Sequence, residues 1–177
     1  WNGFSVISGS PGTGKTTTAI NLAAYLASSG KFVLLVDLDP QANASSGLGV
    51  DYQNLESGTY DVLIGRAPVS RAVRETKVPG LRVLPSSPNL AGAEVELVSQ
   101  LAREWRLKEA LDEVRGAYDF ILIDCPPSLG LLTINGLVAA DRVLIPVQAE
   151  YYALEGLGQL LETINLIKSN LKAELEI

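Results

Sequence analysis

One segment near the start of the chain combines glycines, a lysine and threonines at the spacing of a phosphate-binding loop. It reads G-x-x-x-x-G-K-T from Gly9 to Thr16. A short apolar run at 4–7 precedes it, and a helical pattern begins at Lys15. Glycines let the backbone curl around a phosphate without Cβ clashes, and a helix that begins there directs its N–H groups and dipole at the same point. The alternative is a glycine-rich turn that happens to precede a helix, and the match in pattern and context favours the phosphate site.

The residue types within this loop predict their roles. Lys15 can place its charge on the β- and γ-phosphates of a nucleotide, and the Thr16 hydroxyl can ligate Mg²⁺. We therefore expect the loop to bind ATP or ADP with Mg²⁺. The nucleotide-binding residues expected are Gly9, Ser10, Pro11, Gly12, Thr13, Gly14, Lys15, Thr16 and Thr17.

Two apolar runs further along the chain end in aspartates. Residues 32–36 lead into Asp37 and Asp39, and residues 120–123 lead into Asp124. Ligands of open α/β sheets bind beyond the carboxyl ends of the strands. Asp124 has the form of a Walker B acid, which holds the Mg²⁺ shell, often through water. Asp37 and Asp39 lie on the same side of their strand, so either could face the γ-phosphate and orient a water. For each aspartate the structural alternative is a helix N-cap or a turn acid, and for Asp37 the pattern favours neither role.

The elements that must position these side chains alternate between short apolar runs and helical patterns. Strands are expected at 4–8, 32–37, 81–85, 119–124 and 142–147, and helices at 15–28, 59–63, 90–115 with a break, 131–139 and 155–171. Continuous apolar runs are typical of strands buried on both faces of a parallel sheet. The alternation predicts a three-layer α/β domain of the P-loop type with a mostly parallel sheet. Residues 41–58, rich in Gly, Ser and Asn, are expected to form a functional loop.

Composition narrows the class of protein. The chain has 177 residues, 47% hydrophobic and 19% charged, which predicts one globular domain. No apolar run approaches the ~18 residues of a membrane span, so no membrane partner is expected. One cysteine and no histidine argue against a disulfide, zinc or iron–sulfur site and fit a reducing, cytoplasmic compartment. The net charge of −6 argues against nucleic-acid binding by bulk charge.

The two ends of the sequence have the character of a fragment. The chain starts with Trp1, close to the first predicted strand, and residues 173–177 have the pattern of a further strand. We therefore expect residues 1–177 to form a single, incomplete P-loop ATPase domain whose C-terminal part is missing.

Three separated segments of the chain read VLLVDLDPQAN at 33–43, IDCPPS at 123–128 and VQAEYYALEG at 147–156. Together they resemble the ParA/Soj type of partitioning ATPase, in the group that also contains MinD and the nitrogenase iron protein. The motifs occur in the order that the family has, and the resemblance runs from about Lys15 to Ile177. The D-P-Q-A-N sequence favours ParA/Soj over MinD.

The resemblance implies an ATPase switch for plasmid or chromosome partitioning. ATP and Mg²⁺ would close a homodimer, hydrolysis would open it, and a centromere-binding protein would be the partner. Lys15 and Asp39 would be catalytic, with Asp39 orienting the hydrolytic water in switch I. Thr16, Asp39 and Asp124 would be the residues of the metal site, and Asp124 would be the first residue of switch II. Residues 148–152 would lie near the dimer interface and the nucleotide. The family's non-specific DNA surface lies beyond the residues present here, so DNA binding is not predicted for this fragment.

The phosphate loop departs from the family pattern. The family reads K-G-G-V-G-K-T, and its first lysine reaches the partner's nucleotide, but Ser10 stands at that position. Residues 6–17 look more like the loop of a RecD-type helicase. A nucleotide-binding but catalytically weak or inert fragment is therefore the alternative expectation. A helicase-like motor ranks lower, because no helicase motifs follow residue 18.

Overall fold

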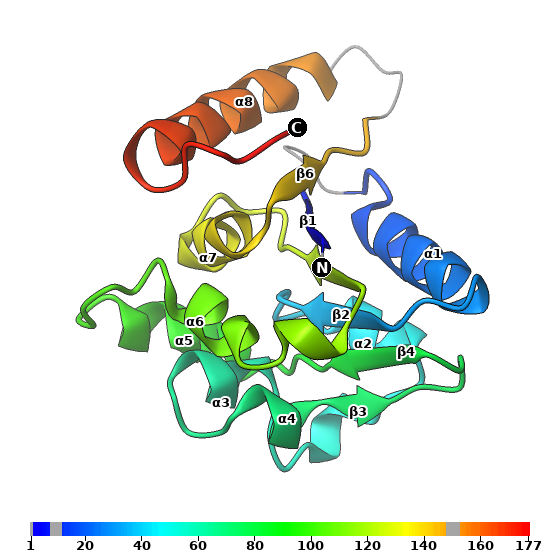
Figure 1. Ribbon diagram of the computed structural model, residues 1–177. Coiled ribbons are helices and arrows are strands. Elements are labelled where there is room, and N and C mark those ends of the chain that lie inside the picture. Colours follow the sequence, from blue (N-terminus) through cyan, green and yellow to red (C-terminus); the bar gives the residue numbers. More distant parts are fainter. Residues whose placement is uncertain (1, 8–11, 148–152) are drawn as a thin grey trace.

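The computed structural model of the chain describes residues 2–7, 12–147 and 153–177, and within them it shows a six-stranded sheet in the order β3-β4-β2-β5-β1-β6 (Figure 1). The strands are β1 (Asn2–Val6), β2 (Val33–Asp37), β3 (Arg74–Glu75), β4 (Leu81–Leu84), β5 (Phe120–Asp124) and β6 (Arg142–Leu144). All neighbours pair in parallel except β3 with β4. The mostly parallel sheet that the sequence predicts is confirmed.

The strand register brings the site residues to one edge of the sheet. Asp37 of β2 lies opposite Asp124 of β5, and Val6 of β1 lies opposite Asp124 on its other side. The carboxyl end of β1 therefore lies beside Asp124, with Asp37 on the next strand along.

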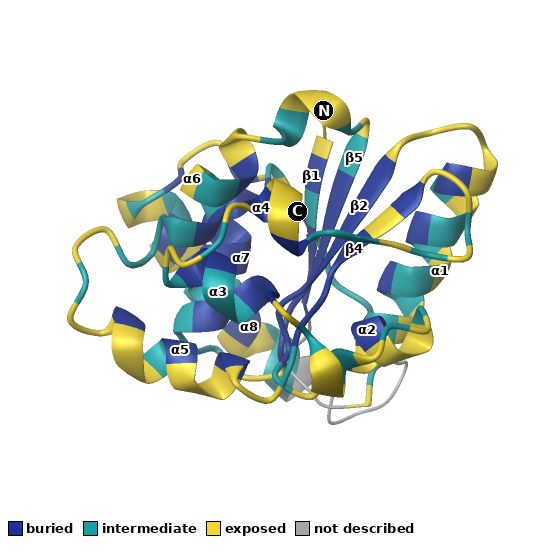
Figure 2. Cartoon of the chain, turned by 90° about the horizontal axis from the view of Figure 1, so that it is seen from below, coloured by how far each residue is buried: buried dark blue, intermediate teal, exposed yellow. Residues whose placement is uncertain are grey.

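Helices cover both faces of the sheet and complete the three layers (Figures 1 and 2). On one face lie α1 (Lys15–Ser28) and α2 (Asn43–Gly47), and the other face carries α3 (Thr59–Leu63), α5 (Leu90–Leu97), α6 (Arg106–Asp112), α7 (Leu131–Ala139) and α8 (Ala153–Asn170). The remaining elements are α4 (Val69–Ala72) and the 3₁₀ turns η1 (Tyr52–Asn54) and η2 (Arg115–Ala117). None of the described helices is long and apolar enough to cross a membrane.

The central strands are buried on both faces, as their apolar runs predict. In β2, Leu34 and Val36 join the core under α3–α8, whereas Val33 and Leu35 join the core under α1. Helix α1 faces the sheet with Ala19, Ala23 and Ala27, spaced one turn apart. Small side chains at this spacing let the helix approach the strands closely, so its first turn is held near their carboxyl ends.

Several elements differ from the sequence-based expectations. Residues 41–58 are not simply a loop, because α2 and η1 lie within them. The break in 90–115 is real and separates α5 from α6, while the two-residue strand β3 has no sequence signal. Near the C-terminus, Glu176 forms a parallel bridge with Arg142, in line with the strand-like pattern there.

Candidate functional site

The described part of the glycine-rich loop has the backbone of a phosphate cradle. Gly12 and Gly14 have φ values of 76° and 80°, in the left-handed region that favours glycine. Gly14 is the N-cap of α1, and its carbonyl accepts a hydrogen bond from the backbone N–H of Thr18 at 2.8 Å. Backbone turns of this kind direct N–H groups at an anion. Gly9, Ser10 and Pro11 lie outside the described residues.

The first turn of α1 meets the end of β5 through a direct hydrogen bond. The hydroxyl of Thr16 donates to Oδ2 of Asp124 over 2.7 Å. Asp124 is fully buried, and its Oδ1 has no hydrogen-bond partner among the residues that the structure describes. The side chain of Lys15, beside Thr16, is also buried. The predicted phosphate and metal residues on these two elements are thus brought together.

Burial controls the electrostatics of Asp124. Desolvation first, and then the charges of Asp37 and Asp39, raise the pKa of Asp124 to about 7, although the hydrogen bond from Thr16 and the charge of Lys15 lower it. A buried carboxyl group with one unpartnered oxygen is stabilised in its charged form by a nearby cation.

The donor set at this point fits Mg²⁺ bound together with phosphate. The hydroxyl of Thr16 and the carboxylate of Asp124 offer the hard oxygen ligands that Mg²⁺ prefers. No cluster of three or more His, Cys, Asp or Glu side chains that could hold a metal occurs within residues 2–7, 12–147 and 153–177. Mg²⁺ usually keeps several waters and takes few protein ligands beside substrate phosphates, so a sparse set is what such a site needs.

Asp37 has a structural role in this geometry. Its Oδ2 accepts hydrogen bonds from the backbone N–H and the hydroxyl of Ser45 on α2, at 2.8 and 2.7 Å, and its Oδ1 accepts from the N–H of Asp39 at 3.1 Å. Burial raises the pKa of Asp37 to about 6, and the hydrogen bonds from Ser45 oppose that rise. Because both oxygens hold the neighbouring backbone, the structural alternative is favoured over a metal-shell role.

Asp39 lies at the start of the turn that follows β2. Its side chain is 7% exposed, and Oδ1 accepts a hydrogen bond from the N–H of Gln41 at 2.9 Å, so one oxygen does act as a turn acid. Its charge is among those that raise the pKa of Asp124, which places the two carboxylates in one electrostatic neighbourhood. Water orientation and metal binding by Asp39 stay predictions.

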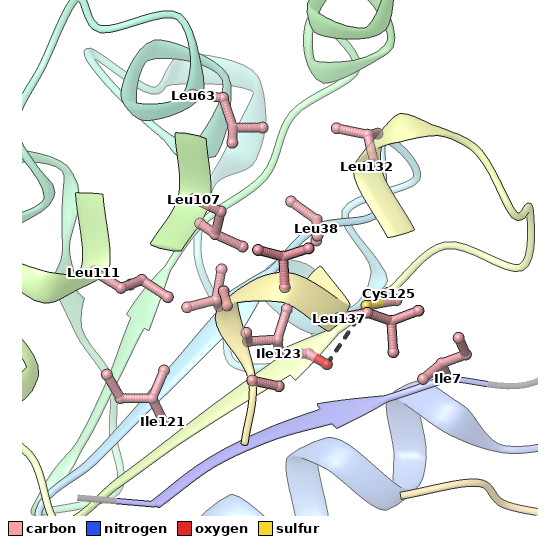
Figure 3. Close-up of a cluster of buried hydrophobic side chains, with 14 of the residues drawn as sticks. Ile7, Leu38, Leu63, Leu107, Leu111, Ile121, Ile123, Cys125, Leu132 and Leu137 are labelled. Atoms are coloured by element: carbon pink, nitrogen blue, oxygen red, sulfur yellow. Dashed lines mark hydrogen bonds between the residues drawn. The ribbon is translucent and has the colours of Figure 1, made fainter. Parts of the chain in front are cut away.

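The turn after β2 is anchored in the hydrophobic core through Leu38. Leu38, between the two aspartates, is fully buried, and Figure 3 shows it with Ile123, Cys125 and Leu137 in the apolar cluster next to α7. Burial raises the pKa of the Cys125 thiol to about 12, and its sulfur lies 3.1 Å from the Ser5 hydroxyl, so the thiol is a packing group.

Sequence reasoning missed the hydroxyl groups that support the turn. The hydroxyl of Thr59 donates to the carbonyl of Asp37 at 2.8 Å, the hydroxyl of Ser86 donates to the carbonyl of Asp39 at 2.7 Å, and Ser45 binds Asp37 as described. All three are fully buried. No spacing rule identifies such partners, although Ser86 follows a predicted strand end. The tyrosines at 151 and 152 lie outside the described residues.

A cavity elsewhere on the molecule does not compete with this site. It measures about 410 Å³ and lies at the amino-terminal ends of the strands, where Phe32, Gly80 and Tyr118 precede β2, β4 and β5. It contains none of the loop or aspartate residues.

Comparison with known proteins agrees with the geometry. The model of a family described as AAA domain matches residues 4–177. The sporulation initiation inhibitor protein Soj of Bacillus subtilis is 57% identical over 166 residues, which cover 94% of this chain and 66% of that protein. The chromosome partitioning protein ParA of Myxococcus xanthus is 55% identical, with 94% of this chain and 59% of that protein covered. The chain thus spans two thirds or less of the length of these relatives.

Solved structures with bound nucleotide share the fold. Cobyrinic acid a,c-diamide synthase from Mycobacterium smegmatis, with a bound ATP analogue and magnesium, superposes with a TM-score of 0.96 at 41% identity, covering 99% of this chain and 71% of that one. An ATP complex of an aspartate-to-alanine variant of McdA from Cyanothece gives a TM-score of 0.93 at 27% identity, covering 99% of this chain and 67% of that one.

Proposed function

The chain belongs to the AAA domain family as a homologue of the ParA/Soj partitioning ATPases, and on that premise we propose that it binds and hydrolyses ATP with Mg²⁺. The observation that carries the proposal is the hydrogen bond from Thr16, in the first turn of α1, to Asp124, whose other, buried oxygen has no partner among the described residues. Solved structures of the same fold hold an ATP analogue, ADP or ATP, two of them with magnesium, which supports the choice of ligand.

Different residues of the site would bind the phosphates, the Mg²⁺ and the attacking water. Lys15 and the loop N–H groups take the β- and γ-phosphates, at the N-terminus of α1, where the helix dipole favours negative charge. The hydroxyl of Thr16 and the carboxylate of Asp124 are the groups that would hold Mg²⁺, which Asp124 could do through water. When bound, Mg²⁺ neutralises charge on the phosphate oxygens during phosphoryl transfer. Asp39 orients the attacking water from the end of β2.

The wider role is a nucleotide-dependent dimerisation switch in plasmid or chromosome partitioning, with a centromere-binding partner. The names of the relatives support partitioning as the process. A cytoplasmic location belongs to the same proposal, because a buried free thiol suits a reducing compartment.

A nucleotide-binding chain with weak hydrolysis is the second candidate. The observation that favours it is Ser10, at the position where the resemblance implies a lysine that reaches the partner's phosphates. A cation delivered in trans to phosphoryl transfer is worth roughly 10³–10⁵ in rate.

Single-turnover hydrolysis by the parent chain and by Asp39→Ala tests the assignment. We expect the variant to lose about 10²-fold or more in rate, because a water-orienting group acts in the transition state, while its affinity for MgATP stays within about threefold. Asp112→Ala, which removes an exposed ion-paired carboxylate, is the matched control and should match the parent. If Asp39→Ala abolishes binding, Asp39 is a metal ligand or a structural residue. No hydrolysis by the parent favours the second candidate.

A further inference from the structure

We infer that Ser86 is a positioning residue for ATP hydrolysis, which holds the backbone of Asp39 in the orientation that its carboxylate needs. The inference rests on the proposed function of Asp39. Ser86 lies in the segment between β4 and α5, far from Asp39 in sequence, and the two are joined by a hydrogen bond of 2.7 Å from the Ser86 hydroxyl to the Asp39 carbonyl.

This bond closes a ring of buried hydrogen bonds. The N–H of Asp39 donates to Oδ1 of Asp37, whose Oδ2 accepts from the hydroxyl of Ser45. The oxygen of Ser45 accepts from the N–H of Ser86 at 2.9 Å, and the hydroxyl of Ser86 returns to the carbonyl of Asp39. The side chains of Asp37, Ser45 and Ser86 are fully buried, so water does not compete for these bonds.

The ring fixes both peptide planes that flank the Cα of Asp39. One plane is held through the N–H and the other through the carbonyl oxygen, so the direction of the Cα–Cβ bond is set. Leu38, the residue before Asp39, is fully buried in the core. The N–H of Gln41 donates a hydrogen bond to one carboxylate oxygen of Asp39. Of these contacts, the Ser86 hydroxyl is the one that ties the turn to the segment leading into α5.

The role of Ser86 can be separated from folding. In Ser86→Ala, the carbonyl of Asp39 still accepts the N–H of Ala42 at 2.9 Å, and the N–H at position 86 can still reach Ser45. No buried polar group among these residues is left without a partner, so the substitution should free the turn while leaving the fold intact. A purely structural bond would instead affect melting and binding together.

Ser57→Ala provides the matched control. Ser57 is also buried, and its hydroxyl has no hydrogen-bond partner among the described residues. The two variants therefore remove the same atom from buried sites, but only Ser86→Ala breaks a bond to Asp39.

The experiment measures single-turnover ATP hydrolysis, MgATP affinity and backbone amide exchange across residues 37–42 in both variants. For Ser86→Ala we expect a rate about 10-fold to 100-fold lower, an affinity within about threefold of the parent and faster amide exchange in this segment, since small misplacement of a catalytic group costs rate. Ser57→Ala should match the parent in all three. On an Asp39→Ala background, Ser86→Ala should have no further effect on the rate.

The outcomes separate this inference from the proposed function. If the parent hydrolyses ATP and Ser86→Ala behaves like Ser57→Ala, the positioning role is overturned and the ATPase assignment stands. The role is also overturned if rate, affinity and melting temperature fall together, or if Ser86→Ala lowers the rate equally without Asp39. A parent that turns over no ATP overturns the hydrolytic function itself, and the positioning role with it.

Discussion

At the residue scale, the carboxyl group of Asp124 has the most strongly raised pKa among the described carboxyl groups of the site. It is fully buried, it accepts one hydrogen bond from Thr16, and its pKa is raised to about 7, chiefly by desolvation. The carboxyl of Asp37, with a pKa of about 6, is raised in the same direction and for the same main reason. Charge on these groups therefore costs stability until a cation or a proton compensates it.

The free energy of unfolding without nucleotide or Mg²⁺ should accordingly fall as the pH rises. A folded-state pKa above the unfolded value of 3.8 means that the folded chain binds the proton more tightly. The stabilisation is complete below pH 3.8 and is lost as the pH rises through about 7. Asp124→Asn, which stays neutral, should show a shallower fall between pH 5 and pH 8 in urea unfolding. Asp51→Asn, which changes an exposed carboxylate, should follow the parent. An equal fall in Asp124→Asn would mean that Asp124 titrates normally.

At the element scale, the sequence predicts the strands and the acids at their ends, but not what holds the acids. The glycine loop, Lys15, Thr16 and Asp124 are predictable because their spacing and their place after apolar runs carry the information. Helix α2 is not, because its sequence NASSG has little helix preference and Ser45 anchors it to Asp37. Ser86 is equally invisible, because its contact depends on the pairing of β2 with β4.

The packing of α7 against the ends of β1 and β5 offers a test at the same scale. A Cβ atom on Gly136 would lie 2.6 Å from the sulfur of Cys125 and 3.3 Å from the Ser5 hydroxyl. Gly136→Ala should therefore lower the free energy of unfolding by about 1–3 kcal/mol, although alanine favours helices. Gly158→Ala in α8, where a Cβ meets nothing within 4 Å, should instead raise it by up to ~1 kcal/mol. Urea denaturation of both variants decides, and a stabilised Gly136→Ala would contradict the close approach of α7.

At the scale of the whole molecule, the parallel register converts distant segments into one site. Val6, Asp124 and Asp37 align across β1, β5 and β2, so the carboxyl end of β1 lies in one row with two buried carboxylates. This convergence is predictable in outline, because parallel strands bring their carboxyl ends to one edge. The second copy that the proposed switch requires is not predictable from one chain's contacts.

A gain-of-function variant tests whether a second copy of the chain contributes to ATP turnover. In the double variant Ser10→Lys, Pro11→Gly, the lysine would face the partner's phosphates, and the glycine would remove the fixed φ of proline. At 4 Å and an effective dielectric of 20, two unit charges interact by ~4 kcal/mol before desolvation. ATP turnover per chain should then rise with protein concentration by about tenfold or more, while the parent curve stays flat. Two flat and equal curves would count against a trans contribution in this chain.

Melting of the chain with and without MgATP tests the central claim, a magnesium–nucleotide site at the carboxyl edge of β1, β2 and β5. At 100 times its Kd a ligand stabilises the fold by ~2.7 kcal/mol, so the melting temperature of the parent should rise by roughly 5–10 °C. In Lys31→Ala, which removes an exposed lysine near the amino ends of the strands, MgATP should raise the melting temperature as far as in the parent. In Lys15→Ala, MgATP should leave the melting temperature unchanged. A parent without a shift, or a Lys15→Ala variant that shifts as far as the parent, would contradict the account.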